Sequence, residues 1–230
     1  VVIQRAGDVI PEIVGPVESL RTGDERVFHM PPTCPVCNSE VIRLEGESVH
    51  RCTNTACPAQ ALEKIKHFVS RGAMDVDGVG EKLSQSLFES GLVHDIADLY
   101  TLSRQSLLTL ERMGQTSADN VLQSIEASKE QGLARVIFGL GIPLVGQEYA
   151  QLLADTYGSV DALSHAAAEE LERIPSIGPK IAESIVAYFR QESNRSIVER
   201  LRAAGVKLEA ESTERQSADL FEGLTFVFTG

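Results

Sequence analysis

Four glycines recur at nearly constant spacing between residues 80 and 178, and they constrain the fold of the chain more than any other feature. They are separated by 34, 32 and 32 residues and are Gly80, Gly114, Gly146 and Gly178. Each has apolar residues four positions and one position before it, a small residue four positions after it and an apolar residue seven positions after it. A repeat period of about 20–50 residues indicates copies of one structural unit.

The residues around the glycines have helical periodicity, at 107–110, 119–128, 149–155 and 181–189. We therefore predict that each unit is a helix, a tight apolar turn, the glycine and a second helix. The glycine should let the backbone turn sharply and approach another molecule closely, and the small residue should let the helices pack. A tetratricopeptide array has a similar period, but it needs aromatic residues, which are only 5% of this chain. A plain helical bundle leaves the phased glycines unexplained.

A helix that begins after such a turn points free N–H groups outward and forms an anion site. Two turns side by side can hold both phosphate strands across a minor groove without reading the sequence. Lys82 and Lys180 each lie two residues after a glycine, although either could also be a solvated helix residue. The predicted DNA-binding residues are Gly78, Val79, Gly80, Lys82, Met113, Gly114, Val145, Gly146, Gln147, Ile177, Gly178 and Lys180.

The charge of the chain opposes simple electrostatic binding of nucleic acid. The net charge is −12, and residues 71–204 carry 12 basic and 19 acidic side chains, a net of −7. Attachment by bulk positive charge is therefore excluded. Backbone amides do not require a positive net charge, so we expect modest affinity that falls steeply with salt.

All four cysteines lie within 24 residues, in the pattern C-x2-C-x14-C-x4-C: Cys34, Cys37, Cys52 and Cys57. Two close pairs joined by a small hairpin predict a zinc site, and four thiolates leave no position for water, so the Zn²⁺ would be structural. A thioredoxin-type motif would need a βαβ context, and two disulfides would need an oxidising compartment. His50 and His67 are further candidate ligands, although a lone histidine near such a site is more often a surface residue or a neighbour of the ligands than a ligand itself.

Other function classes find little support. Gly78-Val79-Gly80 and Gly139-Leu140-Gly141 lack the third glycine and the βαβ unit of a dinucleotide site. No nucleophile–base pair stands out, and no apolar run approaches the roughly 20 residues of a membrane helix. The strand-like runs at 1–5 and 224–230 indicate an internal fragment of a longer polypeptide.

An ordered set of motifs resembles the C-terminal half of bacterial NAD-dependent DNA ligase. Besides the cysteine cluster, the motifs are RAGDVIP at 5–11, HFVSRGAMDVDG at 67–78, LERMG at 110–114, GIPLVG at 141–146 and FEGLTFVFTG at 221–230. The resemblance implies a mainly α chain: a four-motif helix-hairpin-helix domain preceded by a small four-cysteine zinc finger and the end of an OB-fold. The implied boundaries are 1–30 for the end of the OB-fold, 31–66 for the zinc finger, 67–205 for the helix-hairpin-helix domain, 206–219 for a linker and 220–230 for the first strand of a truncated BRCT domain.

That family seals nicks in duplex DNA during replication and repair, by adenylating a lysine in a K-x-D-G motif with NAD. None of the six lysines of this chain fits the motif: Lys64, Lys66, Lys82, Lys129, Lys180 and Lys207. The resemblance therefore implies that NAD and Mg²⁺ bind outside this chain, which is inactive alone. Its implied partners are nicked double-stranded DNA and the remaining ligase domains, in the bacterial cytoplasm at the nucleoid and not at a membrane.

The chain departs from the family pattern at the first glycine of the hairpin, which is kept only at Gly78. Arg112, Leu144 and Ser176 replace it in the other units, so we expect those turns to be stiffer. We expect DNA binding to depend most on the turns at 78–80 and 142–146, and residues 206–230 to be loosely packed. The alternative function is a protein-interaction scaffold without independent DNA binding.

Overall fold

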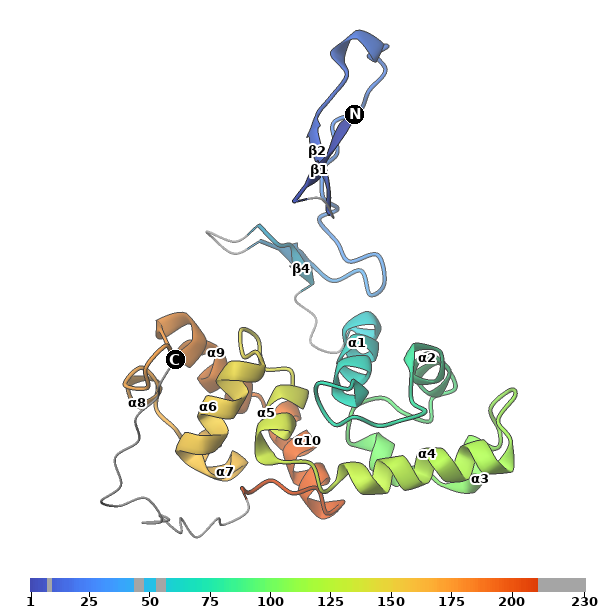
Figure 1. Ribbon diagram of the computed structural model, residues 1–230, viewed down its shortest axis with the longest axis vertical. Coiled ribbons are helices and arrows are strands. Elements are labelled where there is room, and N and C mark those ends of the chain that lie inside the picture. Colours follow the sequence, from blue (N-terminus) through green and yellow to red (C-terminus); the bar gives the residue numbers. More distant parts are fainter. Residues whose placement is uncertain (8–9, 44–47, 53–56, 211–230) are drawn as a thin grey trace, which may run out of the picture. The chain divides into compact units, whose positions relative to one another are not determined.

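The computed structural model describes residues 1–7, 10–43, 48–52 and 57–210 (Figure 1). The predicted BRCT strand at 220–230 and most of the predicted linker lie outside the described residues. The expectation of loose packing is wrong for residues 206–210, because Val206 and Leu208 are buried in the helical core and the N–H of Val160 donates to the carbonyl of Leu208 at 2.9 Å. The chain divides into two compact units, 1–55 and 56–230. Helices dominate the described residues, as the mainly α prediction requires.

The first unit contains two small antiparallel hairpins. Strands β1 (Val2–Ala6) and β2 (Ile10–Gly15) pair with Ile3 opposite Ile13, and a 3-10 turn, η1 (Glu18–Leu20), follows. Strands β3 (Val41–Ile42) and β4 (Arg51–Cys52) pair between the two cysteine pairs. The second hairpin is the one predicted there. Strands of two residues have little stability of their own.

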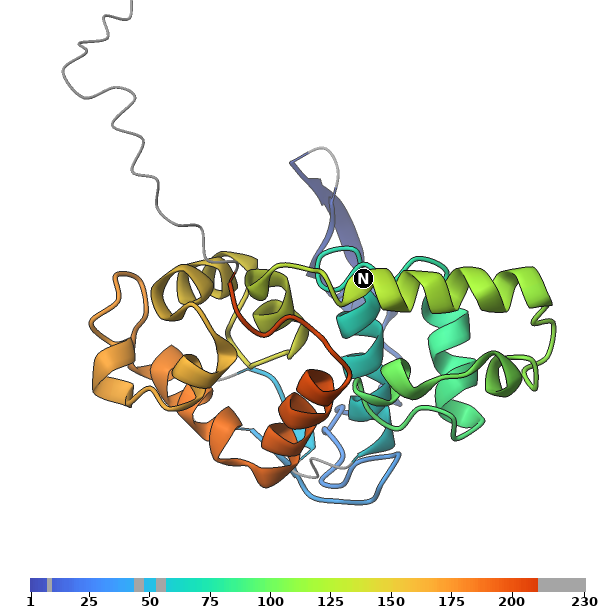
Figure 2. The same cartoon turned by 90° about the horizontal axis from the view of Figure 1, so that it is seen from below.

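The second unit consists of ten helices and a 3-10 turn within the described residues. They are α1 (Pro58–Val69), α2 (Glu81–Glu89), η2 (Asp98–Thr101), α3 (Arg104–Leu107), α4 (Gln115–Ser128), α5 (Leu133–Gly139), α6 (Gln147–Tyr157), α7 (Val160–Ser164), α8 (Ala168–Leu171), α9 (Pro179–Arg190) and α10 (Glu192–Ala203). Figures 1 and 2 both show α10 between the group α1–α4 and the group α5–α9. The predicted boundary between residues 66 and 67 falls inside α1, where Ile65 and Phe68 share the helical core.

The repeat positions build the core as predicted. The small residues four positions after the glycines are fully buried, at 0% exposure: Ser84, Ala118, Ala150 and Ala182. The apolar residues seven positions after them are also buried: Leu87, Val121, Leu153 and Ile185. Both positions fall on one helix face, because three to four residues make one helical turn.

The predicted helix over 107–110 is wrong. Helix α3 ends at Leu107, and residues 108–110 form a turn. The N–H of Leu110 donates to the carbonyl of Leu107 at 3.0 Å, three residues back, which tightens the chain before it reverses. The apolar residue four positions before each glycine therefore belongs to the turn rather than to the preceding helix.

A charged contact joins α10 to the group α1–α4. Arg200 of α10 pairs with Asp95, which precedes η2, at 2.7 Å and with Asp98, the first residue of η2, at 2.5 Å. Burial alone would raise the pKa of Asp98, but N–H donation from His94 and Asp95 and the Arg200 guanidinium outweigh burial and lower that pKa. Asp98 therefore stays ionised and stabilises the fold until the pH falls through its lowered folded-state pKa.

Replacing Ser84 by Ala is expected to raise the free energy of unfolding by about 1 kcal/mol. Ser84 is fully buried, and its hydroxyl has no hydrogen-bond partner among the described residues, whereas the other three repeats carry Ala there. Urea unfolding of both proteins measures the difference. The reverse change Ala118→Ser should lower the free energy of unfolding, and a loss of stability in Ser84→Ala would contradict the expectation.

Candidate metal centre and nucleic-acid interface

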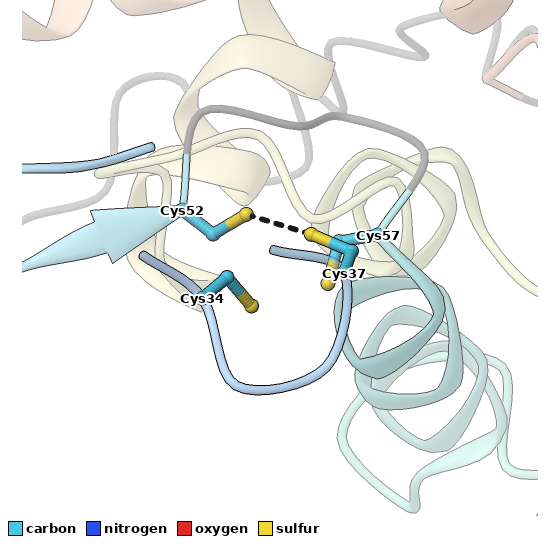
Figure 3. A group of neighbouring side chains, drawn as sticks. All are labelled: Cys34, Cys37, Cys52 and Cys57. Atoms are coloured by element: carbon cyan, nitrogen blue, oxygen red, sulfur yellow. Dashed lines mark hydrogen bonds between the residues drawn. The ribbon is translucent and has the colours of Figure 1, made fainter. Parts of the chain in front are cut away.

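The four cysteine side chains converge on one point (Figure 3). Cys34 and Cys37 precede β3, Cys52 ends β4, and Cys57 is the residue before α1. Their Sγ atoms all lie within 4.8 Å of one another, and those of Cys37 and Cys52 are 3.4 Å apart. Around a tetrahedral Zn²⁺ with bonds of about 2.3 Å, sulfur atoms are about 3.8 Å apart, so this cluster fits the ion.

The local backbone explains how the first pair converges. The N–H of Cys34 donates to the carbonyl of Ser39 at 2.7 Å, and the N–H of Asn38 donates to the carbonyl of Cys34 at 2.9 Å. Asn38 adopts a left-handed conformation with φ of 56°, which Asn tolerates better than most residues. No histidine joins the cluster in the described part of the chain. His67 instead contacts the carbonyl of Phe138 at 2.7 Å.

The four hairpin turns share one backbone conformation. The residue two positions before each phased glycine is left-handed, with φ of 80° at Gly78, 64° at Arg112, 68° at Leu144 and 73° at Ser176. In every turn the N–H of the residue before the glycine donates to the carbonyl three residues earlier, at 3.1–3.2 Å. Three turns therefore keep a geometry that disfavours side chains by about 1–2 kcal/mol.

The phased glycines themselves do not make the sharp turn, so that part of the prediction is wrong. Their φ angles are −80°, −90°, −82° and −91°, an extended backbone that any residue adopts. A Cβ atom built at Gly80, Gly114, Gly146 or Gly178 would meet no atom within 4 Å. Within the described residues, neither conformation nor packing requires glycine at these positions. The space beside each one is open to another molecule.

Each phased glycine is also the N-cap residue, directly before the first residue of α2, α4, α6 or α9. The glycine carbonyl accepts a bond from the N–H four residues later, at 2.9–3.1 Å, and no side chain caps the first turn. The earlier N–H groups lie at a positive helix end and suit an anion. Pro179 lacks an N–H, so the fourth turn has one donor fewer.

Comparison with known proteins links the cysteine cluster and the hairpin turns to the same family of proteins. The NAD-dependent DNA ligase C4 zinc finger domain matches residues 33–59. A SAM-like helix-hairpin-helix tandem matches residues 71–127, and a helix-hairpin-helix motif matches residues 135–198. DNA ligase of Halothermothrix orenii is 51% identical over 232 residues, and that of Desulfitobacterium hafniense is 49% identical over 230 residues. The chain belongs to the NAD-dependent DNA ligase family. It is covered completely in both comparisons and spans 35% of the length of each relative.

The apolar residues predicted to bind DNA are mostly buried in this ligase chain. Val79, Val145 and Ile177 are 3–6% exposed and plug the space between the helices of their hairpins, while Met113 is partly buried. All three buried side chains belong to the helical core, where their burial helps to hold each turn in place.

The polar residues predicted to bind DNA differ in their surroundings. Lys82 and Lys180 are exposed, and neither forms an ion pair within the described ranges. Gln147 donates from Nε2 to the carbonyl of Gly72 at 3.4 Å, and a Cβ at Gly72 would meet that atom at 2.4 Å. The side chain of Gln147 thus packs against the chain itself.

Acidic residues lie beside two of the candidate anion sites. Glu81 lies in the first turn of α2, directly after Gly80, and Glu148 lies in the first turn of α6, two residues after Gly146. Glu81 also pairs with Lys66 at 3.4 Å. Favourable interaction with an anion at these turns therefore rests on backbone N–H groups more than on side-chain charge.

The sequence reasoning missed Leu144 as a surface residue of interest. It is 54% exposed at the tip of the third turn, in the left-handed conformation described above. The sequence does contain a signal for it, because the third repeat has a bulky apolar residue at the position where the first repeat has glycine. Along the described parts of the chain, none of the helices combines the length and apolar character needed to cross a bilayer.

Proposed function

We propose that this chain holds nicked duplex DNA for an NAD-dependent DNA ligase, by backbone contacts from the hairpin turns to phosphates flanking the nick. One observation carries the proposal: four repeated glycines have no conformational or packing role in the described chain and border open space at helix N-termini. A phosphate oxygen that approaches backbone N–H groups closely would exclude a Cβ there.

Several features support recognition without sequence preference. The candidate contact groups are backbone amides and the exposed ammonium groups of Lys82 and Lys180, which bind phosphate rather than base edges. A pair of turns would span the minor groove by contacting the phosphates of both DNA strands. Such contacts fit an enzyme that must act at nicks in any sequence, in replication and in repair, within the bacterial cytoplasm at the nucleoid.

The zinc centre would supply a structural cross-link. Cys34, Cys37, Cys52 and Cys57 would hold Zn²⁺ with four thiolates, and a closed tetrahedral site has no position for a reacting water. NAD and Mg²⁺ would bind in the rest of the ligase, so we expect no nick sealing by this chain alone. The proposal includes a domain assignment of 1–30 to the C-terminal end of an OB-fold, 31–66 to the zinc finger, 67–205 to the helix-hairpin-helix domain, 206–219 to a linker and 220–230 to the first strand of a truncated BRCT domain.

The second candidate function is a protein-interaction scaffold. It is favoured by the net charge of −7 over 71–204 and by the glutamates beside two turns, Glu81 and Glu148. A surface of this sign repels phosphate at long range. The two functions differ in whether the chain binds duplex DNA by itself.

Fluorescence anisotropy with nicked duplex, intact duplex and single-stranded DNA at several salt concentrations tests the proposal. The chain is expected to prefer both duplexes, with affinity that falls steeply as salt rises. Reversing the charge of Lys82 and Lys180 to Glu should weaken binding and reduce the slope of log affinity against log salt by about one for each lysine.

The matched control is Arg195→Glu, because Arg195 is exposed on α10, which does not begin at a hairpin turn. It makes the same charge change as each single lysine reversal and should leave the salt slope nearly unchanged. Absence of duplex binding at the lowest salt, or equal effects of the lysine and arginine changes, would favour the scaffold.

A further inference from the structure

A surface groove lies where the third and fourth hairpin turns meet. Its volume is about 530 Å³, and its lining residues are Leu144, Tyr149, Gly178, Pro179, Lys180 and Ile181. They come from the tip of the third turn, the first turn of α6 and the first turn of α9. The lining is predominantly apolar, with one cation and no acid. We call it the Leu144 groove.

The Leu144 groove is held in place by contacts beneath it. Ser184 of α9 donates from Oγ to the carbonyl of Pro143 at 2.6 Å, which ties the third turn to the fourth. Tyr149 and Ile181 pack partly against the main core. The groove therefore keeps its shape without a ligand and loses little conformational entropy when it binds one.

The exposure and the backbone conformation of Leu144 do not stabilise the fold of the isolated chain. Its side chain is 54% exposed, and its backbone has φ of 68°, a conformation in which a bulky L-residue is disfavoured. The equivalent residue of the first turn is Gly78, which adopts this conformation without penalty. An exposed apolar side chain held on a disfavoured backbone points to a contact with another molecule.

We propose that the Leu144 groove holds deoxyribose rings of one DNA strand, with Lys180 pairing the adjacent phosphate, and that it selects deoxyribose over ribose. The inference rests on the proposed DNA-binding function and adds a specificity site to it. A deoxyribose–phosphate backbone presents apolar C–H groups next to regularly spaced anions. The groove offers apolar side chains next to one cation, beside the fourth turn, so the two surfaces are complementary.

Selection against ribose follows from the lining. The C2′ atom is a methylene in DNA and carries a hydroxyl in RNA. A hydroxyl pressed against Leu144, Pro179 and Ile181 would lose its bonds to water, and a buried polar group without a partner is costly. Besides the Tyr149 hydroxyl, the lining side chains offer no acceptor to replace those bonds.

The test compares an all-DNA duplex with a DNA–RNA hybrid of the same sequence, both fluorescently labelled, for the chain and for Leu144→Asn. Asn tolerates the left-handed turn and is similar in size, so the variant should fold, with a melting temperature no lower than that of the parent chain. We expect the parent to prefer DNA, and Leu144→Asn to bind DNA about tenfold more weakly and to lose most of that preference. Leu20→Asn, which removes a residue that is 76% exposed and outside the groove, should change neither.

The possible failures are distinguishable. If the parent chain binds no duplex, the proposed function and this inference both fall. If the parent binds DNA and Leu144→Asn binds DNA equally well, the inference alone is overturned and the groove is left to a protein partner. A preference for DNA that persists in Leu144→Asn also overturns it, because the hairpin geometry would then be selecting the helix form.

Discussion

Cys52→Ser is expected to abolish zinc binding and to unfold residues 33–59 while the helical unit keeps its melting transition. Strands β3 and β4 have two residues each, so the finger has little backbone pairing to hold it without metal. Structural zinc sites contribute about 10–16 kcal/mol of apparent binding energy, nearly all of it coupled to folding. The helical unit has its own core of buried apolar side chains, which the change does not touch.

Metal content per chain and hydrogen exchange across the finger measure this effect. The parent chain should carry one zinc, and a chelator should reproduce the exchange pattern of Cys52→Ser. His50→Ala is the matched control, because His50 lies between the cysteine pairs but outside the group of four sulfur atoms. Clearly less than one zinc in the parent chain, or equal metal loss in both variants, would contradict the assignment.

Much of the helical core was predictable from the sequence, for a physical reason. A residue four or seven positions after the start of a helix returns to the same face, so the small and apolar residues at those positions had to pack inward. The burial of Ala150 and Leu153 confirms this for the third repeat. The zinc site could be predicted equally well, since the spacing of the four cysteines alone brings two pairs of thiols within reach of one ion.

The conformation of the turns was not predictable from residue type. Arg112, Leu144 and Ser176 are poor candidates for a left-handed backbone, yet all three adopt it. Tertiary packing constrains these turns: in the third turn, Leu144 is followed by the buried Val145 and then by the start of α6. At these three residues, tertiary packing overrides the conformational preference of the residue type.

The Leu144 groove could not be read from the sequence for a related reason. Leu144 and Lys180 are 36 positions apart in the chain, yet both line the groove, where a bond from Ser184 to Pro143 joins α9 to the third turn. The sequence showed each hairpin as an independent unit. Contact between two hairpin units depends on how their helices pack, and the spacing of residues in the sequence does not predict that packing.

Gly146→Asp is expected to stabilise the fold and to weaken duplex binding about a hundredfold. The φ of −82° suits Asp, and its Cβ would enter open space. Asp is among the best residues at the N-cap position of a helix, because its carboxylate accepts from the first N–H groups, and replacing Gly by Asp there should add a few tenths of a kcal/mol to the free energy of unfolding. The same carboxylate would occupy the proposed phosphate site and repel the DNA backbone, at a cost of several kcal/mol.

The matched control for this change is Gly132→Asp. Gly132 begins α5, has a φ of −64° and likewise has no atom within 4 Å of a Cβ, but it is not one of the phased glycines. It receives the same charge and the same cap, so it should stabilise the fold with little effect on affinity. Thermal unfolding and anisotropy on both variants separate the two effects. Since the proposed function requires that a helix start be left uncapped for phosphate, equal affinities of Gly146→Asp and Gly132→Asp would remove the main support for a DNA-binding role of the third turn.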